Sequence, residues 1–120
     1  MLITKNKLIL QVIAALTVIA VIYLLVTKKS AAEINRGEIS VVLNDIAAHA
    51  QTHFRRTDSF EGWELPSSLK NEKIGTFRSK VEYNKVVIYV VGKEIGYNDI
   101  SNVNLETLIT GSKIEIKIRN

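Results

Sequence analysis

The sequence predicts an α+β protein in which a long N-terminal α-helix packs on a small antiparallel β-sheet of about four strands. Two observations predict the helix: a mostly apolar run from Leu8 to Val26, and an amphipathic stretch over residues 29–54 that follows it without a proline. A third predicts the sheet, because apolar and polar residues alternate in short segments after residue 75. The 120 residues suffice for one compact domain beside the apolar run.

The apolar run has the length of a membrane span. A helix of this length rises about 28 Å, close to the hydrocarbon thickness of a bilayer. A secretory signal has a shorter core, of about 7 to 15 residues, with a cleavage site of small residues close behind. The only passable site here, Ser30 to Ala32, lies beyond two lysines. We therefore expect the segment to be retained, with its N-terminus on the cytoplasmic side, where positive groups are in slight excess.

The net charge of +4 comes from the lysines that flank this run. From Ser30 onward, twelve basic residues balance twelve acidic ones. A neutral exported part argues against nucleic-acid binding. The chain has no cysteine, so no disulfide or thiolate metal site contributes to its stability.

Residues 30–56 form the amphipathic half of the predicted helix. Its apolar positions are three or four residues apart and make one stripe that faces a core: Ile39, Leu43, Ile46, Ala50 and Phe54. Gly37 is the one weak position, and we expect a continuous helix from about Ile3 to Phe54. Arg55 and Arg56 end it where cations complement the negative pole. These arginines are also candidates for inter-subunit polar contacts that involve Asp58.

Residues 57–74 are predicted to be a connecting loop, because they hold charges, Gly62 and the only proline. Within the loop, Phe60 and Trp63 are interpreted as aromatic side chains that cover the core. The alternatives are that they bind a carbohydrate or contact another subunit.

Residues 75–120 are predicted to form the antiparallel sheet. We expect a first strand that extends to Tyr83, a turn at Asn84 and Lys85, and a central strand from Val86 to Val91. The segment "GKEIGYND" is interpreted as a turn. A final hairpin turns at Gly111 and Ser112. Its last strand directs its charged residues to one face and three isoleucines to the other: Ile114, Ile116 and Ile118.

No group of residues indicates catalysis. His49 and His53 lie four apart on one side of the helix, but no third metal ligand is near them in sequence. The acidic pair Glu61 and Glu64 lies in a loop without a visible apolar pocket. We therefore expect no enzymatic activity, no metal and no cofactor.

Several segments in a fixed order carry a family resemblance: "NRGEISVVLNDIAAHAQTHFRR", "SFEGWELP", "GTF" and "GKEIG". Together they resemble bacterial type IV pilin-like proteins, in which a long helix precedes a short antiparallel sheet. The chain departs from that family at its start, because no glycine precedes Gly37 and Lys5 stands where mature pilins have a glutamate. We accordingly expect a subunit that keeps Met1.

The resemblance implies a structural subunit of an extracellular pilus-like filament. Identical copies would wait in the inner membrane with a single N-in span, would be extracted by pilus assembly machinery, and would bundle their residues 1–29 in the filament core. The expected packing positions are Leu8, Leu10, Gln11, Val12, Ile13, Ala15, Leu16, Ile19, Ile22, Tyr23 and Val26. The alternative is a membrane-anchored periplasmic accessory protein or a minor pseudopilin of a secretion or pilus machine.

Overall fold

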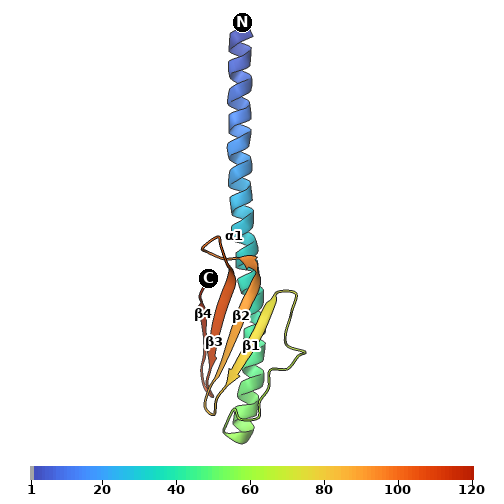
Figure 1. Cartoon of the computed structure of the whole chain (residues 1–120), viewed down its shortest axis with the longest axis vertical. Helices are drawn as coiled ribbons and strands as arrows, with labels where there is room; N and C mark the ends of the chain where they lie inside the picture. The colour runs from blue at the N-terminus through green and yellow to red at the C-terminus, as the bar shows by residue number, and fades with distance from the viewer. Residues whose placement is uncertain (1) are drawn as a thin grey trace. The chain divides into compact units, whose positions relative to one another are not determined.

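The computed structural model describes the backbone of residues 2–120 and the side chains of residues 6–24 and 30–120. The elements are one helix, α1 (Leu2–Thr57), and four strands, β1 (Gly75–Val81), β2 (Val86–Ile95), β3 (Asn102–Ile109) and β4 (Ile114–Ile118) (Figure 1). The strands form one antiparallel sheet in the order β1-β2-β3-β4. The predicted α+β class, with a long N-terminal helix and four antiparallel strands, is confirmed. The chain divides into two compact units, Met1–Ala31 and Ala32–Asn120.

Helix α1 extends one residue before and three residues beyond the predicted range of 3–54. Gly37 lies inside it and does not end it. The helix ends at Thr57, after which Asp58 takes a positive φ of 59° and donates its backbone N–H to the Phe54 carbonyl at 2.7 Å. This bond satisfies a carbonyl of the last turn, which is the usual reason for a left-handed residue at a helix end.

The first hairpin corrects one predicted boundary. β1 ends at Val81, which pairs with Val86, and residues 82–85 form the turn, closed by a bond of 2.9 Å from the Glu82 N–H to the Lys85 carbonyl. The prediction that the first strand reaches Tyr83 is therefore wrong, and Tyr83 is 61% exposed. The predicted central position of the strand that begins at Val86 is confirmed, because β2 pairs with both β1 and β3.

The turn predicted over residues 92–99 forms only in the second half of that segment, where the Asp99 N–H donates to the Gly96 carbonyl at 3.2 Å. The first half is wrong, because β2 continues through it to Ile95, and the pairing of β2 with β3 is irregular between Val91 and Ile95. The buried side chain of Asn35 accounts for this. Its Oδ1 accepts the backbone N–H groups of Lys93 at 3.1 Å and Glu94 at 3.4 Å, and its Nδ2 donates to the Ile74 carbonyl at 2.8 Å. A polar side chain of the helix thus provides the hydrogen-bond partner that β3 would otherwise provide to the bulged backbone of β2.

Gly92 is required where Asn35 approaches the strand. A Cβ atom at this position would collide with Asn35 Oδ1 and would lie 2.9 Å from the Cβ of Val103. The absence of a side chain at residue 92 therefore permits the contact between α1 and the bulge.

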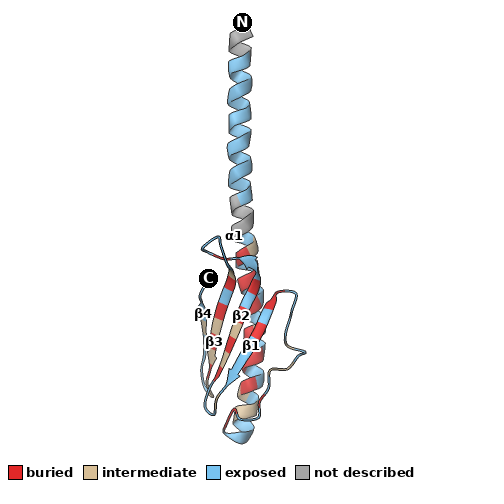
Figure 2. Ribbon diagram, viewed as in Figure 1, coloured by how far each residue is buried: buried red, intermediate tan, exposed pale blue. Residues whose placement is uncertain are grey.

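The core lies between one face of the sheet and the Ala32–Thr57 part of α1 (Figure 2). Ile39, Leu43 and Ile46 of the helix are fully buried, as are the inward residues of β2 and β3. The prediction that the three isoleucines of β4 share one face is confirmed. Only Ile116 packs on the core, whereas Ile114 is 39% and Ile118 53% exposed. They lie opposite the buried Ile109 and Leu105, so they share the helix-facing side of the sheet but lie beyond the helix cover.

Replacement of Asn35 by alanine tests its role at the bulge. Asn35→Ala leaves the Ile74 carbonyl and the backbone N–H groups of Lys93 and Glu94 without their side-chain partner, so we expect the free energy of unfolding to fall by about 1 to 3 kcal/mol. Urea unfolding of the full chain in detergent micelles, followed by the fluorescence of the single tryptophan, Trp63, measures this change. Asn44→Ala is the matched control, because Asn44 is exposed on the same helix. Equal stability of the two variants would refute the role.

Candidate functional site

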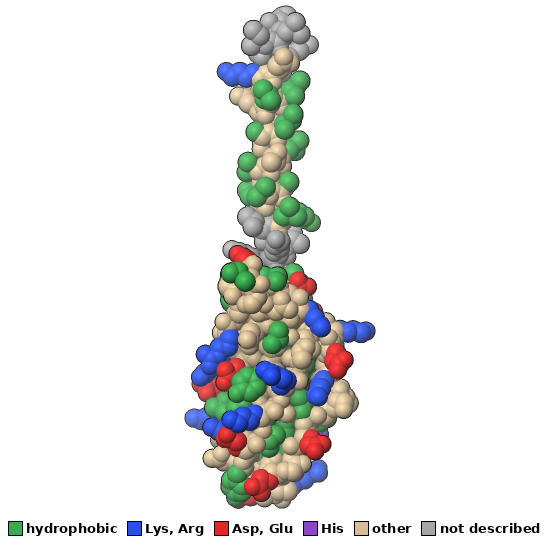
Figure 3. All heavy atoms as spheres, viewed as in Figure 1, with side chains coloured by type: hydrophobic (Ala, Val, Ile, Leu, Met, Phe, Trp, Pro, Cys, Tyr) green, Lys and Arg blue, Asp and Glu red, His purple; other side chains and the backbone are tan. Residues whose placement is uncertain are grey.

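The N-terminal unit carries a continuous apolar surface on α1. Residues Asn6–Leu24 have a mean hydropathy of 2.3, and none of this segment is buried. Its large apolar side chains are between 51% and 70% exposed, and they cover the helix in Figure 3. The predicted packing positions are all exposed where side chains are described: Leu8, Leu10, Gln11, Val12, Ile13, Ala15, Leu16, Ile19, Ile22 and Tyr23. Val26 lies outside the described side chains. This helix segment is long and apolar enough to cross a membrane.

Between Leu8 and Ile22, two polar side chains interrupt this surface. The Thr17 hydroxyl donates to the Ile13 carbonyl at 2.9 Å, which satisfies its donor within the helix. Gln11 is exposed, and within the described part of the chain its amide makes no hydrogen bond. In an apolar environment such an amide needs a hydrogen-bond partner from another molecule. Gln11 is therefore the candidate for a polar contact with a neighbouring helix.

In the second unit, the predicted core positions lie on the sheet-facing side of α1. Ile39, Leu43, Ile46 and Ala50 are 0% exposed, and Phe54 is half-buried. The centroids of the Phe54 and Phe60 rings are 4.7 Å apart. The Phe54 ring also packs on Gly111, where an added Cβ atom would lie 2.5 Å from the ring. This contact anchors the end of the helix to the β3–β4 hairpin.

Trp63 is 4% exposed and donates its indole N–H to His49 Nδ1 at 2.9 Å. His53 Nε2 lies 2.9 Å from the Glu61 carbonyl oxygen. The two histidines therefore hold the connecting loop on the helix at two separate points. Among the described residues, no group of three or more His, Cys, Asp or Glu side chains is arranged to hold a metal ion. Glu61 and Glu64 are both exposed.

Arg36 is a buried cation that the sequence interpretation did not identify. It is 6% exposed, its guanidinium carbon lies 3.7 Å from the centroid of the Tyr97 ring, and its Nε lies 3.5 Å from the Asn120 backbone oxygen. Stacking on an aromatic face offsets part of the cost of taking the charge out of water. Arg36 and Asn35 precede Ile39 by three and four residues. This helical spacing is the sequence signal that could have predicted both on the buried face.

The three candidate polar contacts at the end of the helix are all exposed: Arg55, Arg56 and Asp58. None of them ion-pairs with another described side chain, since the ion pairs in this part of the structure join Glu82 to Lys80 and Lys85, and Glu106 to Arg119. They remain available to a neighbour.

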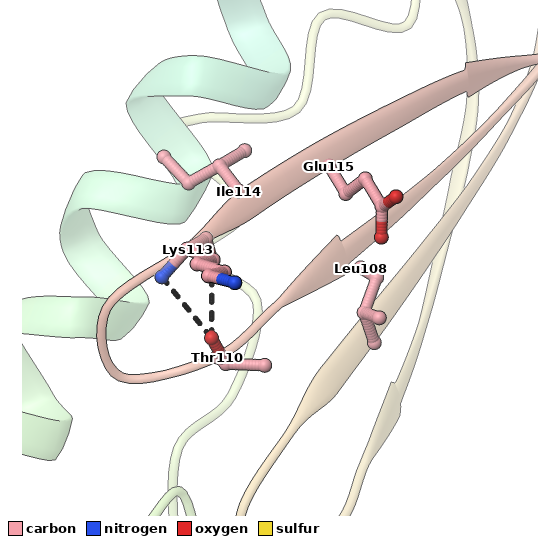
Figure 4. Close-up of a pocket in the computed structure, with 5 residues that line it drawn as sticks. All are labelled: Leu108, Thr110, Lys113, Ile114 and Glu115. Carbon is pink, nitrogen blue, oxygen red and sulfur yellow. Dashed lines mark hydrogen bonds between the residues drawn. The ribbon is translucent and has the colours of Figure 1, made fainter.

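A shallow depression of about 430 Å³ lies at the β3–β4 hairpin. In Figure 4, Leu108 and Glu115 project to one side of the ribbon, whereas Ile114 projects to the other. The Thr110 hydroxyl accepts the Lys113 N–H at 3.1 Å and thereby closes the turn. With one lysine and one glutamate, this open site lacks the converging polar groups that mark a small-molecule pocket.

No family model, curated protein or solved structure matches the chain.

Replacement of His49 tests the link between loop and helix. His49→Ala removes the acceptor of the Trp63 indole N–H, so we expect the free energy of unfolding to fall by about 1 kcal/mol and the emission of Trp63 to change. Thermal unfolding of the detergent-dispersed full chain and its emission spectrum measure both effects. Asp45→Ala, at an exposed position one turn earlier, should alter neither. An unchanged spectrum in His49→Ala would contradict the contact.

Proposed function

We propose that this chain is a structural subunit that polymerises into an extracellular pilus-like filament by bundling the N-terminal part of α1. The observation that carries the proposal is that one helix has both roles: residues Asn6–Leu24 expose an apolar surface, and residues from Ala32 onward form the core with the sheet. An apolar segment of this kind needs lipid or other protein around it. Identical segments of neighbouring copies provide such surroundings outside the bilayer.

The free energy involved is large. The large apolar side chains from Leu8 to Val26, at about 1.5 to 2 kcal/mol each, give roughly 20 to 30 kcal/mol in favour of keeping this segment out of water. Lipid and a helix bundle are similarly apolar, so transfer from one to the other is close to an exchange of surroundings. A subunit that leaves the bundle for water loses most of this stabilisation, so filaments built in this way dissociate very slowly.

The proposal assigns the subunit two locations in succession. It first lies in the inner membrane with a single span and its N-terminus inside, and it then lies on the cell surface in the filament. Pilus assembly machinery transfers it between the two, because extraction of a membrane span needs a driven step. Thr17, bonded within its own helix, is compatible with either apolar environment.

A membrane-anchored periplasmic accessory protein, or a minor pseudopilin, is the second candidate. The same observation favours it, because the length and hydropathy of Asn6–Leu24 suit a passive span. The two candidates differ in what they ask of the segment: an anchor needs only apolarity, whereas a bundle also needs side chains that allow helices to approach closely.

The substitution Ala15→Leu separates these candidates. It keeps the segment apolar and so preserves the span, but it fills a position where neighbouring helices would approach. We expect the membrane-bound protein to be normal and the filaments sheared from producing cells to fall at least tenfold, as seen by negative-stain microscopy and quantified in the sheared fraction. Val18→Leu, which enlarges a side chain at a position outside the expected packing set, is the control.

Two results would count against the filament. Wild-type protein found only as dispersed monomers that mild detergent extracts would favour the anchor. N-terminal sequencing of the sheared material that begins near Glu33 would show that the apolar segment is not part of the assembled subunit.

A further inference from the structure

The domain of residues 32–120 exposes apolar side chains around the end that holds its first helical turns. Four large apolar side chains there are between 46% and 84% exposed: Ile34 on α1, Ile95 at the end of β2, and Tyr97 and Ile100 in the loop between β2 and β3. We propose that these four residues, here called the apolar collar, contact the surface of the lipid bilayer while the chain is anchored there. This inference goes beyond the proposed function, because it needs only the membrane span that both candidate functions share.

The collar residues lie at one level of the domain. The loop of residues 96–101 lies beside the first turns of α1 in this domain (Figure 1), and the Tyr97 ring centroid is 3.7 Å from the guanidinium carbon of Arg36. Asn35, the preceding helical residue, binds the backbone of β2 where that strand approaches the loop. Ile34 adjoins Asn35 in the helix. The collar therefore surrounds one end of the domain and is not scattered over its surface.

The collar residues lie on two sides of α1. Asn35 and Arg36 are 5% and 6% exposed and face the sheet, whereas Ile34 is 61% exposed and lies on the opposite side of the helix. Tyr97 and Ile100 belong to the sheet side. A single protein partner would have to reach around the helix to touch both sides. A bilayer surface surrounds a spanning helix on every side, so it can contact the whole collar at once.

The chain itself brings a bilayer to this end of the domain. Asn6–Leu24 is long and apolar enough to cross a membrane, and Ala32, where the domain begins, follows Leu24 by eight residues. Eight helical residues rise about 12 Å, and the headgroup layer of a bilayer is roughly 5 to 8 Å thick on each side. An anchored chain therefore keeps a bilayer surface within reach of the collar, whereas any other partner would have to be recruited.

The loop can approach lipid without losing hydrogen bonds. The Asn98 Oδ1 accepts the backbone N–H groups of Ile100 and Ser101, each at 3.0 Å. The Asn120 Nδ2 donates to the Ser101 carbonyl at 2.9 Å and to the Asn102 carbonyl at 3.1 Å. Because these backbone groups already have partners, a less hydrated environment does not leave them unpaired. The loop is thus held in one conformation that presents Ile100, the most exposed large apolar side chain of the described residues.

The residue types and the charges around the collar suit the headgroup region. Tyrosine, as at Tyr97, is enriched where a membrane meets water. Apart from the buried Arg36, the charged residues nearest the collar balance in number: Glu33, Glu94 and Asp99 against Lys28, Lys29 and Lys93. The contact therefore depends on the apolar side chains, and we expect it to form on vesicles of neutral lipid and to persist in high salt.

Single-cysteine labelling of the full chain in phosphatidylcholine vesicles tests this contact. The chain has no cysteine, so Ile100→Cys supplies the only thiol for a fluorescent label. Spin-labelled lipids should quench this label at least threefold more than the same label on Ser112→Cys, an exposed position in the turn at the other end of the sheet. Leu16→Cys, within the apolar segment, is the control for the span. Quenching by lipid detects both orientations of insertion equally.

The outcomes separate this inference from the proposed function. Strong quenching at residues 16 and 100 but not at residue 112 supports the contact. Quenching at residue 16 alone, or equal quenching at residues 100 and 112, overturns the contact and leaves the proposed function standing. Absence of quenching at residue 16 shows that the chain does not span the bilayer, and this overturns the contact together with the membrane stage of the proposed function.

A second variant tests the apolar tip without a label on it. In Glu94→Cys the label lies on an exposed position beside the collar, and addition of Ile100→Ser should lower its quenching by lipid at least twofold. Because Ile100 is 84% exposed, this replacement removes little packing, and thermal unfolding should be unchanged. Tyr83→Ser is the matched control, since it removes a 61% exposed aromatic side chain from the turn between β1 and β2. Equal quenching with and without the Ile100 side chain would overturn the contact.

Discussion

The structure of residues 32–120 depends on one constraint: a four-stranded sheet with a single apolar face needs a cover. Within residues 2–120, α1 is the only helix that can supply it. Burial of Ile39, Leu43 and Ile46 against β2 and β3 creates the core, and a small sheet without such a layer is marginal in water. The helix that covers the sheet is also the helix that carries the apolar segment. A change in α1 that affects a membrane or an assembly contact can therefore also affect the stability of the domain, which needs this helix for its core.

Polar contacts fix where the helix lies on the sheet. Asn35 bonds the backbone of β2 and Ile74 at one end of the contact, and Gln51 Nε2 donates to the Thr110 carbonyl at 3.1 Å toward the other end. Apolar packing alone is not directional, so a smooth helix could slide or rotate on the sheet. Hydrogen bonds at two separated points remove that freedom. This explains why a buried asparagine and a glycine at residue 92 occur together in an otherwise apolar core.

Local periodicity sufficed to predict the helix, the four strands and the core positions from Ile39 to Phe54, because each depends on spacing within one element. The sequence failed where partners are distant. The path of β2 through Gly92 depends on Asn35, whose bonds reach 39 and 58 residues along the chain. Burial of Arg36 depends on Tyr97. The exposure of Ile114 and Ile118 depends on how far the helix covers β4. The alternation of apolar and polar residues shows which face a side chain lies on, but it does not show how much of that face is covered.

The apolar segment and the domain surfaces would contribute differently to an assembly. The segment of Asn6–Leu24 supplies a large free energy of burial, but a helix coated with leucine, isoleucine and valine accepts similar neighbours in many registers. A defined polymer needs contacts that fail when a subunit is displaced. The domain of residues 32–120 can supply such contacts, because its surface combines exposed apolar side chains with charged ones. Affinity and register would thus reside in different parts of one chain.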